Sequence, residues 1–214
     1  MAATTSGRWD ISRPLKSLNL EERLNRAFEK TGLLCRETAA PLLGIPWASA
    51  LEALRVLEYT GRARRGYFVE GLSGAQYIRE DAYASITHEL EQPADEMIWL
   101  AAPDPNQVWG KILPHAQDRQ FTIIHGAAVA LKRGIPVALF ERQGHTLRVF
   151  DETVLTDALA AFASAYSKRN IFPALNRLTV KQYPPTAEQA LTEVGFTRVM
   201  LDYVLYRKIS AGVA

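Results

Sequence analysis

Three arginines and a tyrosine lie close together in the segment 61–77, and side chains of these types can bind a nucleic acid. The arginines are Arg62, Arg64 and Arg65, and Tyr67 follows two residues after the last of them. An arginine guanidinium can donate to two phosphate oxygens at once, and a tyrosine ring can stack on a base. The segment therefore predicts contact with DNA or RNA. The alternative is an edge strand whose exposed charges prevent pairing with other chains.

A helical pattern precedes this segment and adds two residues to the predicted interface. Arg55 and Tyr59 are four residues apart, so they lie on one face of the helix, away from its apolar stripe. The complete set of predicted DNA-binding residues is Arg55, Tyr59, Arg62, Arg64, Arg65 and Tyr67.

Acid–base chemistry has weaker candidates. Asp104, which lies between two prolines, is the first to consider. Aspartates in loops commonly accept hydrogen bonds from nearby backbone N–H groups and form turns, so no carboxylate is assigned a catalytic role. The carboxylates considered are Asp104, Asp118, Glu141, Asp151 and Asp202.

Metal and nucleotide sites are not predicted. The four histidines are scattered, and none stands at ligand spacing from another histidine or from the cysteine. The sequence contains neither Gly-x-x-x-x-Gly-Lys-Ser/Thr nor Gly-x-Gly-x-x-Gly after a strand. We therefore expect no metal, no cofactor and no ATPase motor in this chain.

The composition is that of an ordinary globular protein. The 214 residues carry a formal net charge of only +2, so any nucleic-acid binding must come from a local patch. Cys35 is the single cysteine, which excludes an internal disulfide and favours a reducing compartment. No signal peptide or run of transmembrane length is found. A cytoplasmic protein without membrane contact is expected.

The first half of the chain predicts a winged-helix domain. Asn19 and Glu22 have the spacing of a capping box, and Gly32 ends the helix that they begin. Helix, turn, helix, turn, helix and then a basic hairpin is the order of elements in that domain. The expected helices are 20–31, 35–43, 46–60 and 80–90, with Pro46 as the first residue of the third, and the hairpin strands are 63–69 and 75–78, with 71–74 at the tip.

The second half predicts a sheet with two helices. Short apolar strands separated by turns indicate an antiparallel meander, rolled or partly closed. The expected strands are 98–101, 121–124, 127–131, 137–141, 146–150, 178–182 and 196–208, and the expected helices are 155–166 and 186–194. The predicted fold class is α+β, with a winged helix followed by a mostly antiparallel, barrel-like β-rich domain. The predicted divisions are a leading segment 1–18, a winged-helix domain 19–92 and a β-rich domain 97–214.

Several of these segments resemble the C-terminal region of Lhr-type helicases, the large helicase-related branch of superfamily 2. The most specific match is Arg64-Arg-Gly-Tyr-Phe-Val-Glu-Gly-Leu-Ser-Gly-Ala-Gln-Tyr77, which is similar to the wing of that family. Residues 7–9 resemble the motif before the winged helix, and 51–58 resemble the helix before the wing. Residues 104–110 and 134–144 resemble the Asp-Pro turn and the hairpin of the β-rich module.

The resemblance implies a function in DNA repair. Members of the family translocate on single-stranded DNA with ATP and unwind DNA or RNA–DNA duplexes. Their C-terminal block is similar to the AlkZ/YcaQ glycosylases, whose Gln-x-Gln or Gln-x-Asp motif has no clean copy here. We therefore expect a DNA-binding module, for single-stranded, forked or hybrid substrates, that works with a separate helicase motor. The alternatives are a glycosylase-like enzyme and a stand-alone winged-helix regulator.

Overall fold

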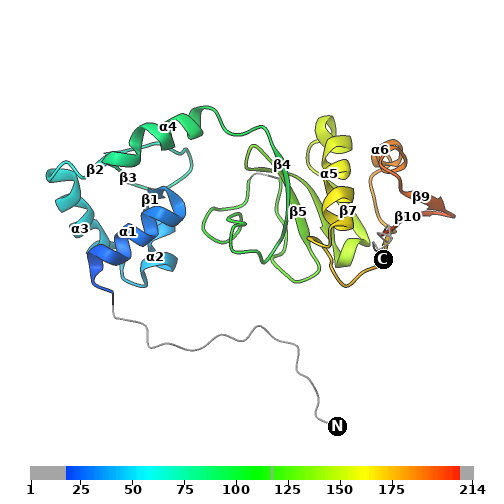
Figure 1. Cartoon of the computed structure of the whole chain (residues 1–214), viewed down its shortest axis with the longest axis horizontal. Helices are drawn as coiled ribbons and strands as arrows, with labels where there is room; N and C mark the ends of the chain where they lie inside the picture. The colour runs from blue at the N-terminus through cyan, green and yellow to red at the C-terminus, as the bar shows by residue number, and fades with distance from the viewer. Residues whose placement is uncertain (1–17, 117, 208–214) are drawn as a thin grey trace, which may run out of the picture. The chain divides into compact units, whose positions relative to one another are not determined.

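The computed structural model describes residues 18–116 and 118–207, which form two compact units (Figure 1). The first unit comprises residues 18–67 and 73–83, and the second comprises residues 68–72 and 84–207. Except for Leu18, the leading segment 1–18 lies outside the described residues, and so do Gly7, Arg8 and Trp9.

Three helices build most of the first unit: α1 (Leu20–Thr31), α2 (Arg36–Leu43) and α3 (Trp47–Tyr59). The predicted capping box is present at the start of α1. The Glu22 backbone N–H donates to the Asn19 side chain at 2.9 Å, and the Asn19 backbone N–H donates to the Glu22 carboxylate at 3.0 Å. These bonds satisfy two backbone donors near the start of the helix.

The inner face of α3 forms the centre of the first core. Ala50 and Leu54 are fully buried, and Leu57 is almost so. The helix begins at Trp47, with Pro46 as its N-cap residue and not as its first helical residue, because the ψ angle of Pro46 is an extended 143°. The buried residues that pack together are Leu24, Ala27, Phe28, Leu34, Ala39, Leu43, Ala50, Leu54, Leu57, Ala63 and Tyr77.

A three-stranded antiparallel sheet completes the first unit. It consists of β1 (Leu33–Leu34), β2 (Ala63–Gly66) and β3 (Gln76–Arg79), and β3 lies between the other two. Two residues give no alternation to detect, which is why the sequence did not predict β1. The helices and the sheet together confirm the predicted winged helix.

The hairpin of the wing is shorter than predicted. Pairing stops at Gly66, which lies opposite Gln76, although the first strand was expected to continue to residue 69. Gly71 and Gly74 have positive φ angles of 84° and 74°, and this left-handed backbone does not continue an antiparallel ladder.

The helix predicted after the wing divides into two elements. The 3₁₀ turn η1 (Glu80–Ala82) comes first, and α4 (Tyr83–Glu91) follows it. The 3₁₀ turn follows the last residue of β3 directly, so the side chains of Glu80 and Asp81 lie beside the wing.

A four-stranded antiparallel sheet lies at the centre of the second unit. Its strands are β4 (Met97–Ala101), β5 (Ala128–Lys132), β6 (Ile135–Glu141) and β7 (Thr146–Val149), in the order β4-β5-β6-β7. The helix α5 (Leu155–Ser167) packs against this sheet (Figure 1). All of these elements lie within three residues of their predicted ends.

Aromatic side chains fill the space between α5 and the sheet. The ring of Trp99 stacks on Phe140, with 5.4 Å between the ring centroids, and meets the edge of Phe162 at 5.0 Å. The indole N–H of Trp99 donates to the backbone carbonyl of Ala158 at 2.7 Å. A buried indole therefore keeps its hydrogen bond while its ring anchors the helix.

The other face of this sheet is covered by chain without regular secondary structure. Phe121 is buried against Val129 and Leu139. The strand predicted at 121–124 is wrong, because this segment is a loop. Its apolar side chains cover the sheet and do not pair with it, and apolar content alone does not separate these two roles.

A second, three-stranded sheet is formed by β8 (Arg177–Val180), β9 (Thr197–Val199) and β10 (Asp202–Tyr206), in the order β8-β10-β9. The helix α6 (Ala187–Glu193) lies between β8 and β9 in the chain and contacts α5. The long strand predicted over 196–208 is two strands, which are separated by a turn at residues 200–201.

The predicted barrel is wrong. A parallel bridge between Thr146 and Gln182 joins the two sheets beside β7, and one core contains residues of both sheets, α5 and α6. Closure would require β4 to pair with the far edge of this array, and within the described residues no sheet closes. The helices α5 and α6 pack with both sheets around one apolar core, so this core is buried although the sheets do not close into a barrel.

The 3₁₀ turn η2 (Arg142–Gly144) provides a test of this packing. Gly144 is buried with a φ of +90°, and a Cβ atom there would lie 2.5 Å from Cδ1 of Leu178. We expect Gly144→Ala to lower the free energy of unfolding by about 3 kcal/mol, measured by chemical denaturation, because it combines backbone strain with a clash.

The matched control is Gly134→Ala. Gly134 has a φ of +78°, but no atom lies within 4 Å of the added Cβ. Backbone strain alone costs about 1–2 kcal/mol. Equal destabilisation of the two variants would contradict the packing of β8 against the η2 turn.

Candidate nucleic-acid interface

Arg64 is held by an acidic and an aromatic neighbour. Its Nε and Nη2 atoms donate to the two carboxylate oxygens of Glu80, each at 2.6 Å. Its guanidinium carbon also lies 4.2 Å from the centroid of the Tyr83 ring. The hydrogen bonds from Arg64 lower the pKa of the Glu80 carboxyl, and the pair raises the pKa of Arg64. Arg64 therefore already has the two-oxygen partner that a phosphate would supply.

Arg62 and Arg79 also carry their own carboxylates. Arg62 Nη2 lies 2.5 Å from a carboxylate oxygen of Glu21 on α1. Arg79 Nε donates to Asp81 at 2.9 Å, and its Nη2 contacts the other oxygen of the same carboxylate. Three of the arginines in or beside the hairpin are thus paired within the protein.

Arg65 differs from these three. It lies opposite Tyr77 in the pairing of β2 with β3, whereas Arg64 lies opposite Ile78, so the two arginines point to opposite faces of the hairpin. Among the described residues, no carboxylate lies within ion-pair distance of Arg65 or of Arg55 on α3. Both side chains are exposed, and both are open to a phosphate.

The same two arginines share one neighbour. Burial and the nearby Glu58 carboxylate raise the pKa of the Tyr77 hydroxyl, and the charges of Arg65 and Arg55 act in the opposite direction. Two positive charges, and the negative charge of Glu58 on α3, therefore act on Tyr77 at the junction of α3 and the wing. This clustering was not visible in the sequence, where the two residues are separated by the end of a helix and a turn.

Two predicted stacking residues are strongly exposed. Tyr59 retains 94% of its accessible surface and Tyr67 retains 77%. Tyr59 ends α3, and Tyr67 follows the last residue of β2. Val56, on α3, is also exposed at 61%. Large side chains with so little cover are available to stack on bases or sugars.

The far end of the wing is tied to α2. The backbone N–H of Ser73 donates to the Glu37 carboxylate at 3.0 Å, and the Ser73 hydroxyl donates to the same oxygen. Burial alone would raise the pKa of the Glu37 carboxyl, but the hydrogen bonds from Ser73 outweigh it and lower that pKa. Sequence reasoning missed Glu37, as it missed Glu21 and Glu80, because nothing in the sequence shows which wing residue each glutamate contacts.

Two of the carboxylates considered for acid–base chemistry are engaged locally. Asp104 accepts from the backbone N–H of Asn106 at 2.9 Å, and Asp151 accepts from that of Thr153 at 3.0 Å. Both therefore form turns. Residues 18–116 and 118–207 contain no group of three or more histidine, cysteine, aspartate or glutamate side chains arranged to hold a metal.

The three helices and the three-stranded sheet of the first unit form a winged-helix domain. Residues 14–98 match the family model of the large helicase-related protein winged-helix domain. The chain carries this Lhr-type domain and is distantly homologous to the C-terminal region of Lhr helicase/uracil glycosylase proteins. None of the described helices has the length and apolar character needed to span a membrane.

Two curated relatives illustrate the homology. The Lhr helicase/probable uracil glycosylase of Mycolicibacterium smegmatis is 32% identical over 178 residues, which cover 76% of this chain and 11% of that protein. The Lhr helicase/uracil glycosylase of Escherichia coli K12 is 28% identical over 212 residues, which cover 90% of this chain and 14% of that protein. The chain therefore spans a small part of the length of either relative.

The Arg64–Glu80 pair makes a measurable prediction. We expect Arg64→Gln to return the pKa of the Glu80 carboxyl to its ordinary range, observed by carbon-13 NMR titration of glutamate carboxyl carbons. Because the pKa of Glu80 is lowered in the folded state, the pair stabilises the fold above the ordinary glutamate pKa. That contribution disappears as the pH falls through the lowered value.

Arg65→Gln is the matched control, since it removes the neighbouring arginine on the opposite face. It should leave the pKa of Glu80 low. If Glu80 titrates identically in the Arg64→Gln variant and the parent, the pair does not form in solution.

Proposed function

We propose that this chain is a nucleic-acid-binding module of an Lhr-type repair helicase. The observation that carries the proposal is that Arg55 and Arg65 are exposed, are free of ion pairs among the described residues, and both act on Tyr77 at the junction of α3 with the wing. In winged-helix and related proteins, a helix and the elements beside it contact DNA. The substrates proposed are single-stranded, forked or hybrid DNA.

The six predicted contact residues receive different roles in this proposal. Arg55 and Arg65 contact backbone phosphates, and Tyr59 and Tyr67 stack on bases or sugars. Arg62 and Arg64 contribute less, because a phosphate must first displace Glu21 or Glu80 from them. Phosphate contacts of this kind hold the nucleic acid without reading its sequence.

The proposal includes a motor as a separate partner. The sequence contains no phosphate-binding loop of the kind that drives translocation, so the movement along DNA is assigned to other parts of a longer protein or to a second chain. The role of this module is then to hold the nucleic acid on which the motor acts.

The names of both relatives include uracil glycosylase, probable in one of them, but such an activity has less support in this chain. That chemistry requires a polar group aimed into a pocket that receives a flipped nucleotide. Asp104 and Asp151 are occupied by turns, and Glu141 lies 3.7 Å from Arg148. A stand-alone regulator would require a dimer that matches a symmetric site, for which the described residues offer no support.

Two pairs of substitutions separate the roles of the arginines. We expect the double variant Arg55→Gln, Arg65→Gln to weaken binding to every DNA sequence and to reduce the slope of log affinity against log salt. The slope falls by about 0.7–0.9 for each phosphate that the protein no longer neutralises, so by about 1.4–1.8 for the pair. Fluorescence anisotropy on single-stranded, forked and hybrid substrates measures both quantities.

The matched control is the double variant Arg62→Gln, Arg64→Gln, which removes the same total charge. It should reduce the salt slope by less than half as much, because those guanidiniums are already neutralised by carboxylates. Equal slopes for the two double variants would contradict the division of roles. Unchanged binding in both would remove the wing from the interface altogether.

A further inference from the structure

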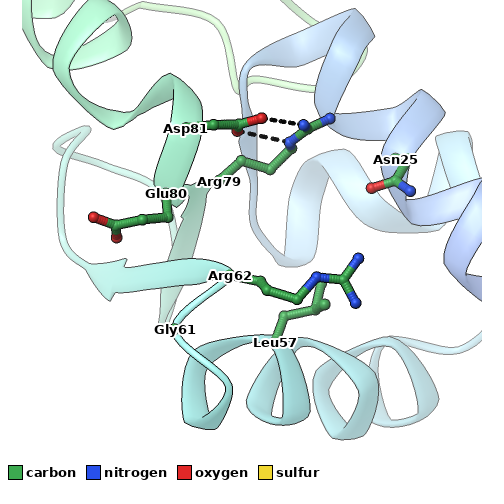
Figure 2. Close-up of a pocket in the computed structure, with 7 residues that line it drawn as sticks. All are labelled: Asn25, Leu57, Gly61, Arg62, Arg79, Glu80 and Asp81. Atoms are coloured by element: carbon green, nitrogen blue, oxygen red, sulfur yellow. Dashed lines mark hydrogen bonds and ion pairs between the residues drawn. The ribbon is translucent and has the colours of Figure 1, made fainter.

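The first unit contains a pocket of about 400 Å³ at the base of the wing (Figure 2). Asn25 comes from α1, Leu57 from α3, Arg62 from the residue before β2, and Arg79 and Asp81 from the end of β3 and the following turn. The pocket is therefore built from four parts of the winged helix. Its volume lies in the range that small-molecule sites occupy.

The charges around the pocket are balanced. Arg62 is paired with Glu21, and Arg79 is paired with Asp81. The hydrogen bonds from Arg79 lower the pKa of the Asp81 carboxyl, so the negative charge that balances Arg79 persists to a lower pH. A phosphate entering the pocket would have to displace a carboxylate from one of the arginines. The pocket consequently favours a neutral ligand over an anion.

Hydrogen-bonding groups remain available around this space. The Asn25 amide makes no hydrogen bond with another described residue, and its donors and acceptor are both open (Figure 2). Arg62 uses only Nη2 on Glu21, and Arg79 uses only Nε and Nη2 on Asp81. The Asp81 carboxylate also interacts with the backbone N–H groups of Asp81 and Ala82, and its remaining lone pairs can accept from a ligand. Leu57 adds an apolar surface, against which a flat ring can lie.

We propose that the pocket binds a guanine base from a single strand. Guanine presents O6 and N7 as acceptors for an arginine, and its N1 and N2 groups donate to a carboxylate. Among the four DNA bases, guanine is the one that offers both an acceptor pair to a guanidinium and two donor groups to a carboxylate. The Arg79–Asp81 pair presents both chemistries side by side, and Asn25 supplies further polar contacts.

The position of the pocket fits the proposed function, on which this inference rests. Arg79, which lines the pocket, lies opposite Ala63 in the pairing of β2 with β3, so its side chain is on the same face of the hairpin as Arg65, the proposed phosphate contact on the wing. A strand held at the wing can therefore place an unstacked base in the pocket. The wing binds the backbone, and the pocket distinguishes one base from the others.

The test uses the full chain and four labelled 12-nucleotide strands. One is all thymine, and the other three carry a single central guanine, adenine or cytosine. In fluorescence anisotropy the guanine strand should bind roughly tenfold more tightly than the thymine strand, and the adenine and cytosine strands should remain within about twofold of the thymine strand, given one additional bidentate contact.

Two variants locate the preference. Asn25→Leu and Asp81→Asn should each bring the ratio of guanine to thymine affinities close to one, while Asn106→Leu, in the second unit, leaves it unchanged. Asp81→Asn changes the net charge, so the ratio is compared and not the absolute affinity. As a direct measurement, the side-chain amide signals of Asn25 should shift on addition of the neutral nucleoside deoxyguanosine but not of thymidine.

The outcomes distinguish this inference from the proposed function. Tight binding of all four strands with equal affinity overturns the guanine pocket and leaves the wing interface standing. If both Asn25→Leu and Asp81→Asn retain the guanine preference, the preference arises elsewhere in the protein, and the guanine pocket is again overturned. Failure to bind any strand, with no shift at Asn25, overturns both proposals.

Discussion

The register of β2 on β3 is the constraint on which the wing depends. Arg64 lies opposite Ile78 and Arg65 lies opposite Tyr77, and both partners are completely buried. Glu80 follows Ile78 by two residues, and it reaches Arg64 from the same face of the hairpin. A shift of one residue would reverse the two faces. It would release Arg64 from its carboxylate and turn Arg65 away from α3.

This register gives neighbouring arginines of the wing two different electrostatic environments: Arg64 is paired with a carboxylate, and Arg65, among the described residues, is not. A guanidinium that is bonded to a carboxylate contributes little net field and offers few free donors, whereas an unpaired one keeps both its charge and its fork of N–H groups. With a net charge of only +2, the chain has no large excess of positive charge to attract a nucleic acid. The position of a few unpaired arginines therefore matters more than their total number.

Features set by neighbouring residues could be predicted from the sequence, and features set by closure or by distant contacts could not. The capping box of Asn19 and Glu22 and the helix near 155–166 depend on local spacing, and both are present. The pairing of Glu21 with Arg62 spans 41 residues, and no local pattern specifies it. The barrel prediction failed for a related reason. Alternating apolar residues indicate which face of a strand is buried, but not whether the two outermost strands of a sheet meet.

The arrangement around the wing separates two tasks that nucleic-acid-binding proteins have to perform. Phosphate contacts position a strand whatever its sequence, and contacts with base edges provide discrimination. In the proposed interface, Arg55 and Arg65 perform the first task because they are free of ion pairs. Arg79 suits the second task because Asp81 neutralises its charge without using all of its donors. A carboxylate beside an arginine thus weakens its attraction for the backbone and adds acceptors that a phosphate cannot use but a base can.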